Sequence, residues 1–210
     1  MDDGDDTIEA DTDYTTEAVD VRSTIRKWRN QFTVQHAKDR CNNVRESYSM
    51  ATFSSGGLLD TISAIRCGFT PKFGTEIDEK MQSMWKDLTD TPSLGDTFSN
   101  DYSNMSVVYL KSGQPCPDFS SSHAGGKPPG IEGETGWQYI AQAKKINELQ
   151  PRVFCLEMVS NILEVDEGRA VELLTGALKT QYYLHFKVIR VAEHGDCSNR
   201  SRTIIHCGFQ

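Results

Sequence analysis

The chain lacks any apolar run near the roughly 18 residues that a membrane-spanning helix needs. Its six cysteines, at positions 41, 67, 116, 155, 197 and 207, form no Cys-x-x-Cys pair and no Cys/His spacing of the zinc-binding kind. No internal repeat is visible. These absences predict a reduced, intracellular protein with no membrane partner and no structural metal.

Basic residues are missing from the first twenty positions, which carry nine acidic side chains. The rest of the chain has 21 acidic and 22 basic residues, so the formal charge of −8 comes almost entirely from this end. A segment so acidic and so poor in apolar residues is expected to be a disordered tail, 1–20. The near-neutral remainder neither demands nor excludes a polyanionic partner.

A basic amphipathic helix and a linker are predicted for 21–47. The apolar positions on one helical face are Val21, Ile25, Trp28 and Phe32, among the basic residues Arg22, Arg26, Lys27 and Arg29. Such a helix either touches nucleic-acid phosphates or packs its apolar face and leaves its charges in water, and general burial preferences favour the second reading.

From residue 48 onward, strand-like and helix-like patterns alternate, which is typical of an α/β domain with a mostly parallel sheet. The expected strands lie near 48–53, 71–76, 107–110, 153–157, 183–191 and 202–208, with helices between them. We therefore predict one such domain over 48–210. It follows the acidic tail and the helical linker.

Cys116 lies between Pro115 and Pro117, just after the apolar run 107–110. The prolines restrict the backbone on either side, so the direction of the thiol is set in advance. Taken alone, a cysteine in such a turn is more often structural than reactive. Whether Cys116 is a nucleophile or a buried structural thiol therefore depends on the motifs that accompany it.

Three predicted strand ends carry the features of a nucleoside pocket. The first ends in the small residues 54–57, which let a ligand approach the backbone before a helix. The next two end in Glu76 and Asp96, and a carboxylate at the tip of the second strand is where doubly wound folds hold ribose hydroxyls. Each could be an ordinary turn or cap residue, but three in series favour the pocket.

Two later segments add charged groups. Glu157 closes a strongly apolar strand, where it is either a solvated surface carboxylate or an acid that acts beside the thiol. Arg200 and Arg202 are spaced by one residue on an extended segment and so point the same way. They suit a phosphate or a base carbonyl, and equally a plain salt bridge.

In this order, these elements resemble the DNA cytosine carbon-5 methyltransferases from about Tyr48 to Phe209. The residues 115–120, Pro-Cys-Pro-Asp-Phe-Ser, match the nucleophile motif of that family, and the loop 120–135 that follows looks like its mobile catalytic loop. The remaining matches are Ser55-Gly56-Gly57, Glu76, Asp96, Glu157 and the pair Arg200 and Arg202.

The resemblance implies a Rossmann-like methyltransferase fold with helices on both faces of the sheet. It implies S-adenosylmethionine as cofactor and DNA, presenting a flipped cytosine, as partner. Cys116 would attack carbon 6, Glu157 would hold the N3 and amino edge, and Arg200 and Arg202 would hold the base carbonyl and its phosphate. Ser120 is a further expected substrate contact. The expected cofactor contacts are Phe53, Ser55, Gly56, Gly57, Glu76, Ile77, Asp96 and Thr97.

The chain departs from the family pattern at Ser55, where a glycine is usual, at Met158, where an asparagine is usual, and at Ser198, where a glutamine is usual. It reaches Gln210 before the target-recognition region and the last motif of the family. We therefore expect a catalytic core that is incomplete at the C-terminus. The alternatives are target recognition by a second chain, a non-catalytic remnant, and an RNA cytosine methyltransferase; a nicotinamide-dependent enzyme ranks far below them.

Overall fold

The computed structural model describes residues 48–210 apart from 57, 122–125, 179–181, 196 and 210. The described residues belong to one compact unit, Tyr48–Gln210. The predicted acidic tail, 1–20, and the predicted basic helix and linker, 21–47, lie outside the described residues. No helix in the described part of the chain combines the length and the apolar character that a bilayer span requires.

A six-stranded sheet with the order β2-β1-β3-β4-β6-β5 forms the centre of the fold. Its strands are β1 (Ser49–Phe53), β2 (Thr70–Gly74), β3 (Tyr109–Gly113), β4 (Val153–Val159), β5 (Tyr182–Arg190) and β6 (Ser201–Phe209). The ladders β1–β2, β1–β3 and β3–β4 are parallel, whereas β6 is antiparallel to β4 and to β5. Among the described strands, only β6 is therefore reversed, which confirms a mostly parallel sheet.

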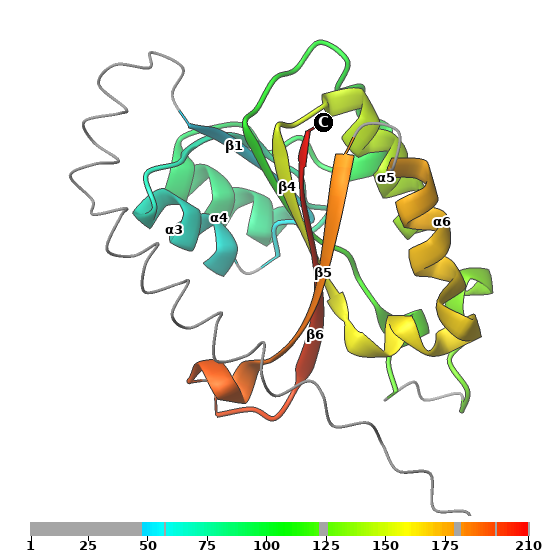
Figure 1. The fold of residues 1–210 in the computed structure, drawn as a ribbon. Coiled ribbons are helices and arrows are strands. Elements are labelled where there is room, and N and C mark those ends of the chain that lie inside the picture. Colours follow the sequence, from blue (N-terminus) through cyan, green and yellow to red (C-terminus); the bar gives the residue numbers. More distant parts are fainter. Residues whose placement is uncertain (1–47, 57, 122–125, 179–181, 196, 210) are drawn as a thin grey trace, which may run out of the picture. The chain divides into compact units, whose positions relative to one another are not determined.

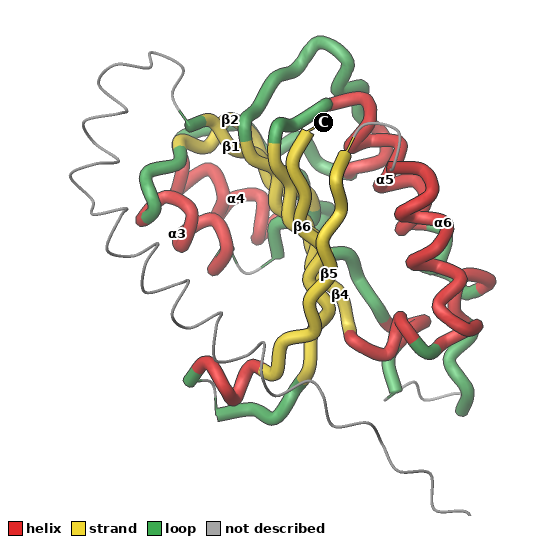
Figure 2. Tube along the Cα trace, viewed as in Figure 1, coloured by secondary structure: helices red, strands yellow, loops and turns green. Residues whose placement is uncertain are grey.

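Helices cover both faces of this sheet. They are α3 (Leu59–Arg66), α4 (Glu79–Thr89), α5 (Gln138–Leu149) and α6 (Arg169–Leu178). Figure 1 shows α3 and α4 on one side of the strands and α5 and α6 on the other, and Figure 2 shows the same three layers coloured by secondary structure. The predicted α/β architecture, with helices on both faces, is confirmed.

Alternation along β4 decides which side chains enter the core and which reach the site. Phe154, Leu156 and Met158 are buried, whereas Cys155 and Glu157 remain partly exposed. Successive side chains of a strand point to opposite faces, so Cys155 and Glu157 share the face away from this buried set. The buried set joins α5 and α6 residues in the main apolar cluster, where each large side chain contributes about 1.5–3 kcal/mol.

The strand predicted before Asp96 is reduced to a single bridge between Gly74 and Ser93. The backbone N–H of Gly74 donates to the Pro92 carbonyl at 3.2 Å, and the N–H of Leu94 donates to the Gly74 carbonyl at 2.9 Å. Proline has no N–H to donate, which prevents the ladder from continuing through residue 92. The sequence predicted this segment at the correct position, but it predicted a regular strand where the structure has a single bridge.

Candidate active site

The carboxyl ends of the parallel strands meet at one edge of the sheet, which is where α/β folds bind their ligands. A hollow of about 460 Å³ there is lined by residues from the loop after β1, from β3 and β4, and from the β5–β6 pair. Four of the predicted site residues line it together: Ser55, Glu157, Arg200 and Arg202. Segments more than 140 residues apart in the sequence are thus brought to one site.

Glu157 and Arg202 form an ion pair across β4 and β6, with 2.5 Å between Oε1 of the carboxylate and Nε of the guanidinium. Their side chains are 34% and 24% exposed, so both charges are largely withdrawn from water. Arg202 also donates through Nη1 to the carbonyl of Ser201 at 2.9 Å. The salt bridge anticipated for the arginine pair therefore exists, and its partner is the acid predicted to act beside the thiol.

Cys116 begins the short helical turn Pro117–Phe119, and this turn is fastened from three directions. The backbone N–H of Phe119 donates to the Cys116 carbonyl at 3.2 Å. The fully buried Phe119 ring meets the Tyr139 ring edge-on at 5.0 Å, and Nδ2 of Asn161 donates to the Phe119 carbonyl at 2.9 Å. Asn161 was not anticipated from the sequence, because nothing local marks it as a partner of residue 119.

Burial raises the pKa of the half-buried Cys116 thiol, because a thiolate loses hydration there. Arg202 lowers the pKa, Glu157 raises it, and a hydrogen bond from the backbone N–H of Val159 lowers it. The thiol is therefore within the electrostatic reach of both members of the Glu157–Arg202 pair. Burial is the largest of these effects, so the pKa of the thiol lies above its ordinary value.

A buried carboxylate joins the cysteine turn to the end of the predicted catalytic loop. Oδ2 of Asp118, a residue only 5% exposed, accepts hydrogen bonds from the backbone N–H and the hydroxyl of Thr135, both at 2.6 Å. A Cβ on Gly133 would lie 2.6 Å from both carboxylate oxygens, so only glycine leaves room for this contact. We call the Asp118–Thr135 contact the clasp. It too was missed from the sequence, although Asp118 is part of the nucleophile motif.

On the expected cofactor side, the Glu76 carboxylate closes the loop that follows β1. Its Oε2 accepts from the backbone N–H of Gly56 at 2.8 Å, and its Oε1 accepts from the N–H groups of Ile77 and Asp78 at 2.8 and 3.2 Å. The carboxylate stands just beyond β2, as predicted from the sequence. It therefore holds the loop close to the hollow.

Two residues in the loop after β1 have strained backbone conformations. Ser54 (φ 53°) and Leu58 (φ 63°) are left-handed, a conformation that costs a residue with a Cβ roughly 1–2 kcal/mol. Ser55, which stands where a glycine is usual, is not among the residues with positive φ. Helix α3 then begins at Leu59, directly after the strained position.

The other predicted cofactor contacts lie around this loop, outside the hollow. Phe53 is fully buried and packs on Tyr102, with 4.9 Å between the ring centroids. Thr97 is buried and its hydroxyl lies 2.6 Å from that of Thr75. Ile77 is 74% exposed, and Gly57 lies outside the described residues.

Asp96 and Ser120 have local partners in this structure. The Asp96 carboxylate accepts from the N–H of Phe98 at 3.1 Å and from the hydroxyl of Ser99 at 2.6 Å, so it caps a short helical turn. This is the cap role that the sequence left open. Ser120 ends the cysteine turn, where its N–H donates to the Pro117 carbonyl at 3.3 Å.

The residues around the hollow fit a polar nucleoside cofactor. The Ser55 hydroxyl is buried at the hollow and makes no hydrogen bond to the described residues, which leaves it available to a ligand. The Glu76 carboxylate accepts from the N–H of Gly56, the next residue of the same loop. Within the described ranges, no three His, Cys, Asp or Glu side chains are grouped as metal ligands.

Comparison with known proteins points to one family. A family model described as C-5 cytosine-specific DNA methylase matches residues 13–210. The chain is similar to the Type II methyltransferase M1.ScrFI of Lactococcus lactis subsp. cremoris, with 28% identity over 197 residues, 87% of this chain and 50% of that relative. It is also similar to the Type II methyltransferase M.HhaI of Haemophilus parahaemolyticus, with 27% identity over 143 residues, 67% of this chain and 43% of that protein.

Among solved structures, a DNA modification methyltransferase encoded within an E. coli prophage shares the fold, with a TM-score of 0.62 and 19% identity over 78% of this chain and 47% of that one. The chain thus spans half or less of the length of these relatives.

Proposed function

The chain belongs to the C-5 cytosine-specific DNA methylase family, and we propose on this basis that it transfers a methyl group from S-adenosylmethionine to carbon 5 of cytosine in DNA. The reaction would proceed through a covalent adduct with Cys116. The observation that carries the proposal is that Glu157 is paired with Arg202 and lies opposite Gly113 in the β3–β4 ladder, three residues before Cys116.

In the proposed reaction, the Cys116 thiol first loses its proton to solvent water, and the sulfur then forms a bond to carbon 6 of the cytosine ring. Arg202 and the Val159 N–H favour the thiolate, and they oppose the effect of burial. Attack moves electron density toward N3 and turns carbon 5 into a nucleophile. The ring has to be flipped out of the duplex for this approach, at a cost of a few kcal/mol.

Glu157 would hold the N3 and amino edge of the base, since its side chain lines the hollow. In its protonated form it can give a proton to N3 as negative charge develops on the ring. Arg202 keeps that carboxylate oriented, and the exposed Arg200 extends the positive surface toward a phosphate. The cofactor, when bound, supplies an electrophilic methyl group to carbon 5. Loss of the carbon-5 proton then breaks the bond between sulfur and carbon 6 and regenerates the thiolate.

A second candidate is a non-catalytic remnant that binds the cofactor or another protein, and Ser55, which stands where the family usually has a glycine, favours it. Calorimetry of the full chain with S-adenosylmethionine separates the two when it is combined with an activity measurement. Binding with methyl transfer supports the enzyme, whereas binding without transfer supports the second candidate. We further propose target recognition by a second chain and an intracellular location, nuclear in a eukaryote.

The direct test measures transfer of a labelled methyl group from the cofactor to duplex DNA by the full chain. We expect label in DNA that contains cytosine and none in matched DNA in which every cytosine already carries a 5-methyl group. A matched RNA oligonucleotide tests the RNA alternative. Equal labelling of both DNA substrates would contradict transfer to carbon 5.

A further inference from the structure

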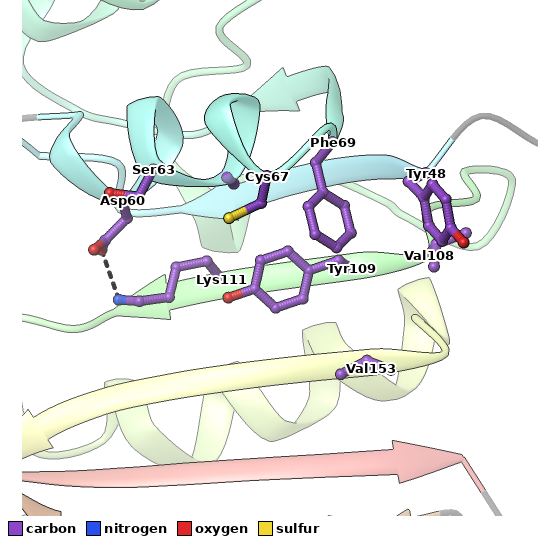
Figure 3. Close-up of a pocket in the computed structure, with 10 residues that line it drawn as sticks. Tyr48, Asp60, Ser63, Cys67, Phe69, Val108, Tyr109, Lys111 and Val153 are labelled. Carbon is purple, nitrogen blue, oxygen red and sulfur yellow. Dashed lines mark ion pairs between the residues drawn. The ribbon is translucent and has the colours of Figure 1, made fainter. Parts of the chain in front are cut away.

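A lysine that the proposed reaction does not use lines the hollow. Lys111 is on β3, its side chain is only 12% exposed, and its Nζ lies 2.7 Å from Oδ2 of Asp60. Figure 3 shows the Lys111 side chain extended along β3 toward Asp60 of α3. A largely buried ammonium is costly unless it is paired, so this pairing accounts for part of its placement.

The Asp60–Lys111 pair forms a wall between two hollows. One is the site described above, and the other is a groove of about 470 Å³ bounded by Tyr48, Phe69 and Tyr109. Asp60 belongs to the first turn of α3, immediately after the strained loop that ends at Leu58. The pair therefore ties the strand that carries the cysteine turn to the helix that follows the expected cofactor loop.

The Lys111 ammonium and the Glu157 carboxylate both lie near Gly113, which has no side chain. The position that a Cβ on Gly113 would occupy lies 3.4 Å from Oε2 of Glu157 and 3.8 Å from Nζ of Lys111. Since Gly113 is the direct neighbour of Glu157 in the β3–β4 ladder, the missing side chain leaves open space between the ammonium and the carboxylate.

The Cys155 thiol is near enough to both Lys111 and Glu157 for their charges to affect its pKa. Burial raises the pKa of the Cys155 thiol, Lys111 lowers it and Glu157 raises it, so both charges act on one group. Cys155 is the direct ladder partner of Lys111.

We propose that Lys111 is a positioning residue for Glu157. Arg202 holds Oε1 of the carboxylate directly, whereas the Lys111 ammonium, fixed by Asp60, lies beyond ion-pair distance of Glu157 and attracts the carboxylate across the space beside Gly113. The carboxylate then keeps one orientation toward the base. This catalytic consequence rests on the proposed function, but the electrostatic coupling between Lys111 and Glu157 does not.

The coupling between Lys111 and Glu157 is tested without substrate by urea unfolding of the full chain and of three variants: Lys111→Met, Glu157→Gln and the double variant. Coupled residues give a double-variant midpoint that departs from the sum of the two single shifts. Lys72→Met, which removes an exposed lysine of β2, is the matched control and is expected to be additive with Glu157→Gln. Additive shifts for Lys111 and Glu157 would overturn the proposal.

The consequence is tested by the rate of adduct formation with DNA that carries 5-fluorocytosine. Lys111→Met should lower the rate constant at saturating DNA roughly tenfold while leaving the half-saturating DNA concentration unchanged, because a misplaced group slows the chemical step. Lys111→Arg should recover most of the rate, and Lys72→Met should match the wild type. A fall in DNA affinity with an unchanged saturated rate would overturn the positioning role.

The adduct measurement tests the proposed function, and urea unfolding tests the coupling between Lys111 and Glu157. Absence of any adduct with the wild-type chain would remove the proposed function, whereas the urea cycle would still decide whether Lys111 holds Glu157.

Discussion

At the scale of single residues, the reactivity of Cys116 depends on two side chains that are already paired with each other. Arg202 favours the thiolate and Glu157 opposes it, while burial works against ionisation. Because the two charges are joined at 2.5 Å, removing either one exposes the thiol to the other alone. The pair therefore modulates the pKa of the thiol, on which burial has the largest effect.

This balance predicts the alkylation behaviour of Cys116 in the absence of substrate. Iodoacetamide reacts with the thiolate, so the rate should increase as the pH rises toward the raised pKa of the thiol. Arg202→Ala should raise that pKa and slow alkylation at a fixed pH, whereas Glu157→Gln should lower it and speed alkylation. The rate changes by a factor of about ten for each pKa unit.

Peptide mass spectrometry of the full chain measures this rate at Cys116 separately from the other cysteines. The exposed Cys67 is the internal control and should react alike in all three proteins. Faster alkylation in Arg202→Ala than in Glu157→Gln would show that the electrostatic account of the site is wrong.

At the scale of elements, the clasp connects two segments that the sequence presents as separate motifs. The Asp118 carboxylate is buried in the cysteine turn, and both of its bonds to Thr135 come from the start of the chain segment that leads into α5. A buried carboxylate is stable only when its oxygens are hydrogen-bonded. Loss of one donor should therefore be felt directly in stability.

Thr135→Val keeps the shape of the side chain and removes the hydroxyl donor, so it should lower the free energy of unfolding by about 1–3 kcal/mol. Thr135→Ser keeps the hydroxyl and should cost much less. Urea unfolding of the full chain measures both. Equal losses for Val and Ser would mean that the hydroxyl bond to Asp118 contributes nothing.

Trp85 of α4 packs against Gly74, the last residue of β2, and leaves no room there for a side chain. A Cβ on Gly74 would lie 2.6–2.7 Å from ring atoms of Trp85, which is fully buried. Gly74→Ala should therefore destabilise the chain by about 1–3 kcal/mol through overpacking. It should also disturb Thr75 and Glu76, which follow directly and hold the loop after β1.

Gly176 of α6 provides the matched comparison. A Cβ there meets nothing within 4 Å, so Gly176→Ala should stabilise the helix by about 0.5–1 kcal/mol. Thermal unfolding of the two variants should move in opposite directions from the wild type. A higher melting temperature for Gly74→Ala would contradict the packing at Trp85.

At the scale of the whole molecule, the sequence was sufficient for the architecture because the apolar runs alternate with helical patterns at strand spacing. Periodicity located strands such as β4, whose alternate residues are buried. Strand ends were less predictable. β3 extends to Gly113 because Lys111 and Ser112 find partners on both neighbouring strands, which no local pattern reveals.

The candidate site was predictable only as a set of separate motifs. Family order pointed to Cys116, Glu157 and Arg202, but their mutual contacts depend on the pairing of β4 with β6. The Lys111–Asp60 pair joins residues about fifty positions apart, and its only local signal is a lysine directly after an apolar run. Contacts of this kind arise from tertiary structure and leave little trace in local sequence.

The central claim is that Cys116 bonds to a cytosine ring, and covalent trapping tests it most directly. The full chain is incubated with cofactor and duplex DNA that carries 5-fluorocytosine, in which the fluorine prevents release of the adduct. Denaturing electrophoresis and peptide mass spectrometry then detect and map the bond. The account predicts an adduct at Cys116 for the wild type and for Cys67→Ser, and none for Cys116→Ser. An adduct of equal yield with Cys116→Ser, or methyl transfer by that variant, would contradict it.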